Sequence, residues 1–232
     1  MKRLVFFLFL AVSFSVLRAQ TRMRDIFASS PDSVFPMLTR NNRLDCIDFI
    51  ENKMPARVKN RLDDVVELLS LTDSYLCLRT SQRSQVEMRL LSDSLFCLVN
   101  TYEGPAPDSH IRFFNLKWQP VAVDLPKLCV KDFWAKSGQR GLAESQSASS
   151  LGDGSALSEG GIPDSLVQEA DFVIRSLSDL MLVRIAPSPE EPVIIFSLQT
   201  SELTEKEREL AQRFVQPLKF RWNGEAFVRQ AE

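Results

Sequence analysis

The sequence is poor in the residues that most often build catalytic and metal centres. Its 232 residues include one histidine, which excludes a metal site with several histidines and leaves a single imidazole for acid–base chemistry. The 28 basic and 30 acidic residues are nearly balanced, so the chain lacks the positive excess of a nucleic-acid binder. We expect no nucleic-acid partner. With 44% hydrophobic residues, the chain is also too apolar to be disordered.

Motifs that identify a reaction or a cofactor are missing as well. The sequence has no GxSxG, HExxH, P-loop or GxGxxG pattern, and no CxxC pair for zinc or thiol–disulfide chemistry. A calcium site at Asp153-Gly154-Ser155 would lack further oxygen ligands at spaced positions. We therefore expect no cofactor and no metal ion, and a protein that is not an enzyme.

The amino terminus holds the one long apolar run. Lys2 and Arg3 precede a run from Leu4 to Leu17, and Ala19 is a small residue at a cleavage point. This pattern is typical of a secretory signal peptide over residues 1–19 and too short for a membrane span. We expect cleavage after Ala19 and a periplasmic or secreted chain. That chain would have net charge −5 and no transmembrane segment.

The four cysteines could pair in an exported protein, but their positions argue against one pairing. Cys77 and Cys97 lie in predicted strands with a third strand, near residues 85–91, between them. Second-neighbour strands lie about 9–10 Å apart, beyond the roughly 7 Å that a disulfide allows. Cys46 has the pattern of a buried helix residue, and Cys129 lies in an apolar connection. We expect four free, mostly buried thiols.

Short elements recur in the same order in two parts of the chain. They are Asp25-Ile26-Phe27-Ala28 with Pro31-Asp32-Ser33-Val34, and Asp132-Phe133-Trp134-Ala135 with Pro163-Asp164-Ser165-Leu166. Residues 136–162 separate the second pair and hold six of the eight glycines, which indicates a flexible insertion. We therefore predict two related units, at 20–123 and 124–232.

Hydrophobic periodicity predicts an α+β fold, in which each unit lays helices on one face of an antiparallel β-meander. In the first unit we expect a helix from near Ser33, a helix over 40–53, and strands at 65–71, 75–80, 85–91, 95–100 and 111–119. In the second we expect a helix over 166–177, strands at 180–186 and 193–200, a helix from a Thr204–Glu207 capping box to 215, and a type I′ hairpin at Asn223-Gly224.

The run PDSVFPMLTRNNRLDCIDF at residues 31–49 resembles a family of exported proteins of unknown function from Bacteroides-type bacteria. The resemblance continues through Tyr75, Val86-Glu87-Met88, Lys117-Trp118 and Trp222-Asn223-Gly224. It implies export from a Gram-negative cell, a two-part α+β fold and no established activity. The helix-plus-meander plan is also similar to β-lactamase-inhibitor-protein and PepSY-type modules, which is a likeness of architecture alone.

Candidate catalytic residues are few. His110 follows Asp108 and Ser109 in what we expect to be a loop, but sequence neighbours rarely form the triangle of a catalytic triad. The pairs Asp45 with Asp48 and Asp63 with Asp64 could serve acid–base chemistry, although a solvated helix face and a turn explain them more simply.

Aromatic residues offer a better candidate site, since they occur on corresponding strands of the two units. One strand face could stay exposed as a groove for a protein, a peptide or a glycan, with Arg112 and Lys219 among its rim. The alternative is a shared core. The candidate binding residues are Phe114, Lys117, Trp118, Phe220, Arg221 and Trp222.

Three functional hypotheses follow. The first is an exported, non-enzymatic binding module of the cell envelope. The second is a hydrolase with an unrecognised carboxylate or His110 centre. The third is an inhibitor or assembly factor that acts through residues 136–162.

Overall fold

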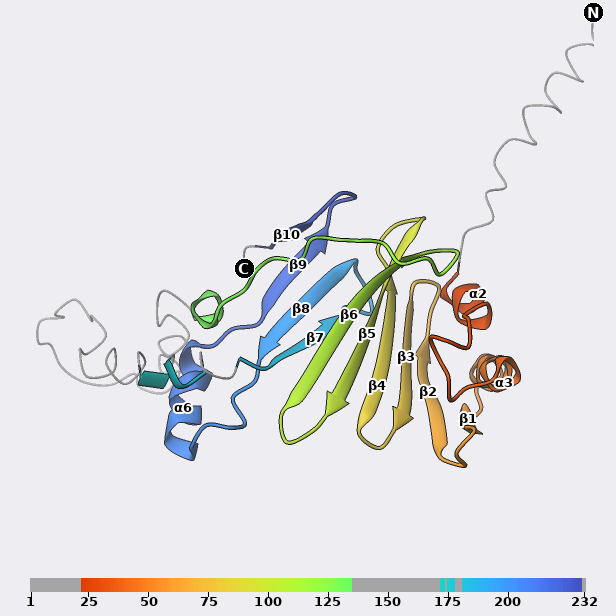
Figure 1. Ribbon diagram of the computed structural model, residues 1–232, viewed down its shortest axis with the longest axis horizontal. Coiled ribbons are helices and arrows are strands. Elements are labelled where there is room, and N and C mark those ends of the chain that lie inside the picture. Colours follow the sequence, from red (N-terminus) through yellow and green to blue (C-terminus); the bar gives the residue numbers. More distant parts are fainter. Residues whose placement is uncertain (1–21, 135–171, 174, 178–180, 231–232) are drawn as a thin grey trace, which may run out of the picture.

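Two antiparallel sheets make up most of the protein. The computed structural model describes residues 22–134, 172–173, 175–177 and 181–230 (Figure 1). One sheet has six strands in the order β1-β2-β3-β4-β5-β6, and the other has four in the order β10-β9-β8-β7. With a few helices added, the α+β class is confirmed. The described residues include no helix that is both long and apolar enough to cross a membrane.

The six-stranded sheet is a simple meander. Its strands are β1 (Arg57–Lys59), β2 (Val65–Leu71), β3 (Tyr75–Ser81), β4 (Ser84–Leu90), β5 (Leu95–Glu103) and β6 (Pro107–Asn115). Four of the expected strands are confirmed as β2 to β5, while the short β1 was not foreseen. Neighbours in sequence pair because tight polar turns join them.

The last strand of this sheet lies earlier than expected. The sequence predicts a strand over residues 111–119, but β6 begins at Pro107. Proline has no backbone N–H to donate, and this costs little at the first residue of an edge strand. The strand ends at Asn115, whose side-chain Oδ1 accepts hydrogen bonds from the amides of Lys117 and Gln119 at 2.9 and 3.0 Å. This turn sets Trp118 at φ 61° and folds it back over the sheet.

Two helices, α2 (Met23–Ala28) and α3 (Arg40–Glu51), pack on one face of the six-stranded sheet (Figure 1). The start of α3 is set by a capping box, in which Thr39 Oγ1 accepts from the Asn42 amide and Asn42 Oδ1 accepts from the Thr39 amide. The first core lies between the helices and the sheet, and includes Phe27, Phe35, Leu38, Ile47, Leu76, Met88, Phe96 and Trp118.

The helix expected from Ser33 does not form. Turns take its place, with Val34 donating its amide to Pro31 O and Leu38 donating to Phe35 O. The reason is Pro36, which lacks a backbone N–H and disfavours helical geometry at the residue before it.

The opposite face of the six-stranded sheet packs on the second sheet. Its strands are β7 (Val183–Pro187), β8 (Val193–Leu198), β9 (Leu218–Trp222) and β10 (Phe227–Arg229), with η1 (Val130–Phe133) and α6 (Glu205–Phe214) beside them. The second core includes Cys97, Val99, Phe113, Ile194, Phe196, Phe214 and Phe220. Successive residues of a strand face opposite ways, so Phe113 enters this core and Phe114 enters the first.

The second half of the chain follows the expected order in its described part. The Thr204–Glu207 capping box begins α6, as predicted. The hairpin at Asn223-Gly224 is wider than a two-residue turn, since Trp222 pairs with Phe227 and Asn223 Oδ1 accepts from the amides of Glu225 and Ala226. The insertion at 136–162 and most of the helix expected at 166–177 lie outside the described residues. The division into two related units stays a prediction.

All four cysteines are free. Strand β4 separates Cys77 from Cys97, as expected, since each pairs with a different residue of it. Burial raises the pKa of the Cys46 and Cys97 thiols to about 12 and that of Cys77 to about 11. These three thiols are therefore protonated at neutral pH and behave as small apolar residues.

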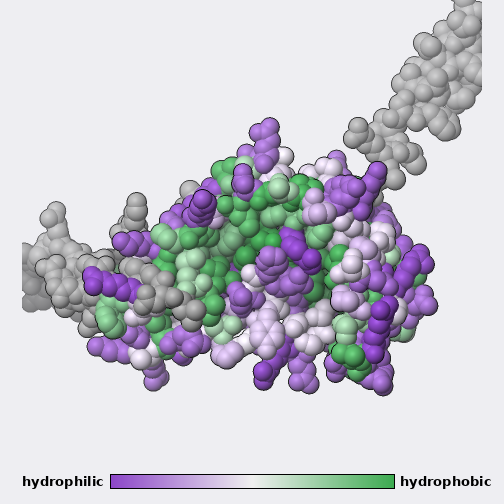
Figure 2. Space-filling model, viewed as in Figure 1, coloured by the Kyte–Doolittle hydropathy of each residue, from purple (hydrophilic) through white to green (hydrophobic). Residues whose placement is uncertain are grey.

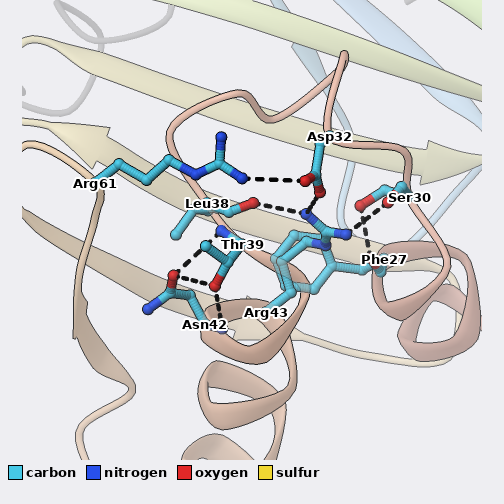
Figure 3. Close-up of polar contacts among 8 residues, drawn as sticks. All are labelled: Phe27, Ser30, Asp32, Leu38, Thr39, Asn42, Arg43 and Arg61. Atoms are coloured by element: carbon cyan, nitrogen blue, oxygen red, sulfur yellow. Dashed lines mark hydrogen bonds and ion pairs between the residues drawn. The ribbon is translucent and has the colours of Figure 1, made fainter.

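A buried arginine holds the segment before α3 in place (Figure 3). The Arg43 side chain is 2% exposed. Its Nη1 donates to Leu38 O at 2.7 Å and to Asp32 Oδ1 at 3.1 Å, and its Nη2 donates to Ser30 O at 2.7 Å. Because Ser30 O and Leu38 O flank the turns at 31–38, one guanidinium determines the path of the whole segment.

We expect Arg43→Ala to lower the free energy of unfolding by about 3 kcal/mol, because it leaves two buried carbonyls without donors. Urea unfolding with linear extrapolation measures the change. Arg61→Ala is the control, since Arg61 binds the same Asp32 at 3.1 Å from an exposed position and should cost less than about 1 kcal/mol. Equal losses in the two variants would contradict the role assigned to Arg43.

A buried carboxyl lies on the face of the sheet that meets the second sheet. Glu87 is 5% exposed, and its Oε1 accepts from the Tyr75 hydroxyl at 2.6 Å. Its Oε2 is buried and has no hydrogen-bond partner among the described residues. Burial raises the pKa of Glu87, and the Tyr75 hydrogen bond offsets part of that shift. Nearby, Arg89 joins the sheets by donating to Pro189 O and Glu190 O at 2.6 and 2.9 Å.

We expect Glu87→Gln to stabilise the protein increasingly as pH rises. The raised pKa means that the folded state holds its proton where the unfolded carboxyl, with a pKa of about 4.3, has lost it. The native carboxyl therefore costs stability as pH climbs from about 4.3 through the raised folded pKa, and glutamine removes that cost. Urea unfolding at pH 4 to 8 measures the difference. A pH-independent difference would refute the assignment.

The control is Glu67→Gln. Glu67 accepts from Arg57 and Arg79 at 2.9 and 3.0 Å, so its loss should destabilise slightly at neutral pH, the opposite sign.

Candidate functional site

The residues predicted to form one aromatic groove are divided between the two cores. Phe114 and Trp118 are buried in the first core, where Trp118 Nε1 donates to Ile26 O at 3.1 Å. Phe220 is buried in the second core, on the other side of the six-stranded sheet. The expected single groove is therefore not formed, because strand alternation and the turn at Asn115 send the two sets to opposite faces.

The basic residues of the expected groove are also dispersed. Lys117 and Lys219 are exposed, and Arg221 forms an ion pair with Glu191 on the second sheet. Arg112 lies with its Cζ 5.4 Å from the centre of the Phe114 ring.

One of the predicted aromatics, Trp222, meets two further aromatic residues at the second core. Trp222 and Phe227 have ring centroids 5.1 Å apart, and Phe113 lies 5.8 Å from Phe227. Partly buried apolar residues packed against the same core include Ile111 and Val123. Figure 2 shows hydrophobic residues gathered near the centre of one face, with hydrophilic residues around them.

His110 lies in a strand rather than in the expected loop. It pairs with Asn100 across β5 and β6, and Asp108 is on the same face two residues earlier. Ser109 faces the other way, and its hydroxyl lies 2.9 Å from that of Thr101. The three residues therefore cannot converge as a triad. Asp45 and Asp48 are exposed on α3, and no group of three metal-binding side chains occurs among the described residues.

A cavity opens on the helix-bearing face, beyond the reach of α2 and α3. It has two adjoining lobes of about 330 Å³ each, which share Thr80, Ser84, Val86 and Asn100. The first lobe is also lined by Val34, Phe35, Pro36, Met37, Leu38, Asn60, Leu62, Asp64, Val66 and Ser81. The second is also lined by Gln85, Thr101, Tyr102, Asp108 and His110.

The segment at 31–38 forms one wall of the first lobe because it turns instead of forming a helix. Phe35 and Leu38 point into the core, and Arg43 holds the backbone on either side. The turn between β1 and β2 forms the facing wall. There, Asn60 Oδ1 accepts from the amides of Leu62 and Asp64 at 2.8 and 3.1 Å. Arg61 joins the two walls by donating its amide to Met37 O at 3.0 Å.

The second lobe places polar side chains at the ends of β4, β5 and β6. Register puts Asn100 opposite His110 and Tyr102 opposite Asp108 on one face. Tyr102 is 54% exposed, so its ring is available to a ligand. Asp108 is partly engaged, since its Oδ1 accepts from the Ser109 amide at 2.9 Å.

The cavity is suited to binding. An apolar floor of Phe35, Val66 and Val86 lies under amide and hydroxyl groups such as those of Asn100 and Tyr102. Sequence reasoning missed it because the region before His110 was taken as a loop. No alternation marks these residues, since Thr101, Glu103 and Ser109 between them are polar as well, so only the strand register shows which side chains share the cavity.

Comparisons with known proteins give a family and a fold. A family model described as a protein of unknown function, DUF3256, matches residues 14–155. No curated protein matches the chain. A solved domain of an uncharacterised protein from Porphyromonas gingivalis W83 is similar in fold, with TM-score 0.64 and 24% identity over 90% of this chain and 98% of that one. The expected likeness to an uncharacterised family is thus confirmed. Export and the PepSY-like architecture stay predictions.

Proposed function

Because the chain belongs to the DUF3256 family, whose function is unknown, its function has to be argued from its own residues, and we propose a non-enzymatic protein that binds a glycan in the two-lobed cavity. The observation that carries this proposal is the lining itself. Neutral amides and hydroxyls stand over an apolar floor, with an exposed tyrosine at one end. A sugar presents the matching surfaces, since its C–H faces are apolar and its edges carry hydroxyls that donate and accept.

The lining supports a glycan over an extended peptide. Peptides that bind along a sheet commonly add to a free edge through main-chain hydrogen bonds. At the outer edge of β6, however, Pro107 has no amide hydrogen and the Ser109 amide already donates to Asp108. The cavity instead opens on a face of the sheet, where side chains do the binding. The amide side chain of Asn100 offers both a donor and an acceptor to neighbouring hydroxyls, while Asn60, whose Oδ1 accepts from two backbone amides, offers its Nδ2 as a donor.

The proposal includes export. The predicted signal peptide at 1–19 supports a place in the envelope or outside the cell, where glycans are abundant ligands. The triad form of the hydrolase hypothesis is not carried forward, because Ser109 lies on the opposite face from Asp108 and His110. The hypothesis of an inhibitor or assembly factor depends on residues 136–162, which lie outside the described residues.

We expect Tyr102→Ala and Asn100→Ala each to weaken glycan binding about ten-fold, since each removes hydrogen bonds or ring contact at the ligand. The test is a titration of the purified protein with a panel of soluble di- to tetrasaccharides, supplied as neutral sugars and as uronates. Amide resonances locate the site, and calorimetry gives the dissociation constant.

Val228→Ala is the matched control, because Val228 is 51% exposed on the second sheet, close to the 54% of Tyr102. It should leave binding unchanged. If no sugar moves the resonances of residues lining the cavity, or if Val228→Ala weakens binding as much as Tyr102→Ala, the proposed function is wrong.

A further inference from the structure

One arginine on the helix-bearing face has no polar partner within the part of the chain that the structure describes. Arg112 is half-buried on β6, with its guanidinium over the Phe114 ring at 5.4 Å. Its Nε is buried and has no hydrogen-bond partner, and no hydrogen bond or ion pair links it to any residue that the structure describes. A half-buried charge in this state has lost part of its hydration without replacement.

The contrast with two other buried arginines makes this arrangement informative. Arg43 and Arg89 also have a buried Nε without a partner. Each of them nevertheless makes three hydrogen bonds through its terminal nitrogens, all to oxygens of the protein. The protein thus satisfies the guanidinium groups that hold its own segments together. Arg112 holds no other segment of the described chain, and the contact recorded for its guanidinium is the one with the Phe114 ring.

Arg112 lies beside the second lobe of the cavity. His110 lines that lobe and is two residues earlier on the same strand face, a spacing of about 7 Å. Across the sheet, Arg112 pairs with Leu98, which is fully buried, so apolar side chains surround its stem. An anion would meet there a planar fork of donors on an apolar ground, where charge-assisted hydrogen bonds are strong.

We infer that the ligand is an acidic glycan whose carboxylate binds Arg112 while its ring and hydroxyls occupy the lobe lined by Asn100, Tyr102 and His110. This inference rests on the proposed function and adds the class of ligand. A carboxylate fits one guanidinium in bidentate fashion. The cavity also carries Asp64 and Asp108, whose repulsion is stronger toward a doubly charged phosphate monoester than toward a singly charged carboxylate.

The first test compares each uronate of the sugar panel with its neutral counterpart. We expect the unsubstituted protein to bind uronates about ten-fold or more tightly, and the preference to shrink as salt rises. Arg112→Gln should abolish the preference and leave neutral-sugar affinity within about two-fold. Arg112→Lys, which keeps the charge without the fork, should retain part of it. Arg221→Gln, on the second sheet, removes the same charge and should change nothing.

Equal binding of uronates and neutral sugars overturns the inference and leaves the proposed function standing. So does a uronate preference that survives in Arg112→Gln. Urea unfolding shows whether Arg112→Gln is folded, and if it is not, Arg112→Lys decides the outcome.

The second test does not need a sugar. Titration of the purified protein with sodium acetate should move the Arg112 side-chain Nε–Hε resonance saturably, while those of Arg43 and Arg89 stay in place. No movement at Arg112 overturns the carboxylate site. Movement with acetate and with a tripeptide carboxylate, but with no sugar of the panel, overturns the glycan and with it the proposed function.

Discussion

Both faces of the six-stranded sheet must be covered, and the rest of the structure follows from that constraint. Strands β5 and β6 carry apolar side chains at odd and even positions alike, so that Phe113 and Phe114 enter different cores. A strand of this kind is stable only between two layers. The helices α2 and α3 supply one layer, and the second sheet with α6 supplies the other. The first half of the chain therefore depends on the second half for the burial of one face.

The helix layer is incomplete, and its end is where the cavity lies. Pro36 prevents a helix over 33–38, and Arg43 replaces helical hydrogen bonding by holding the carbonyls of Ser30 and Leu38. The segment can then line the cavity while the carbonyls of Ser30 and Leu38 stay hydrogen-bonded. A buried charge at this point is costly to desolvate, but it is hydrogen-bonded to three oxygens, and it defines one path for eight residues that have no regular structure. Arg43 therefore both anchors the segment at 31–38 and fixes the wall that this segment forms at the first lobe of the cavity.

Local signals in the sequence account for most elements of the fold. Strand-like runs joined by short polar turns located β2 to β5, and the capping box at Thr204 located α6. The same reasoning misplaced His110, because Pro105 and Pro107 suggest a loop when read locally. Proline is tolerated there only because β6 is an edge strand, which is a property of the whole sheet. The grouping of Trp118 with Trp222 failed for a related reason, since a turn after β6 carries Trp118 to the opposite face from the second core.

The sequence by itself determined the α+β fold class, the meander, the absence of reaction motifs and the lack of a disulfide between Cys77 and Cys97. Each of these depends on composition or on spacing along one chain. Only the tertiary structure decided which polar residues share a cavity and which charges lack a partner. Asn60, Asn100 and His110 are far apart in sequence, and their meeting depends on strand register and on how far α3 extends over the sheet. For the same reason no pattern could single out Arg112, since a missing partner is known only when the position of every neighbour is known.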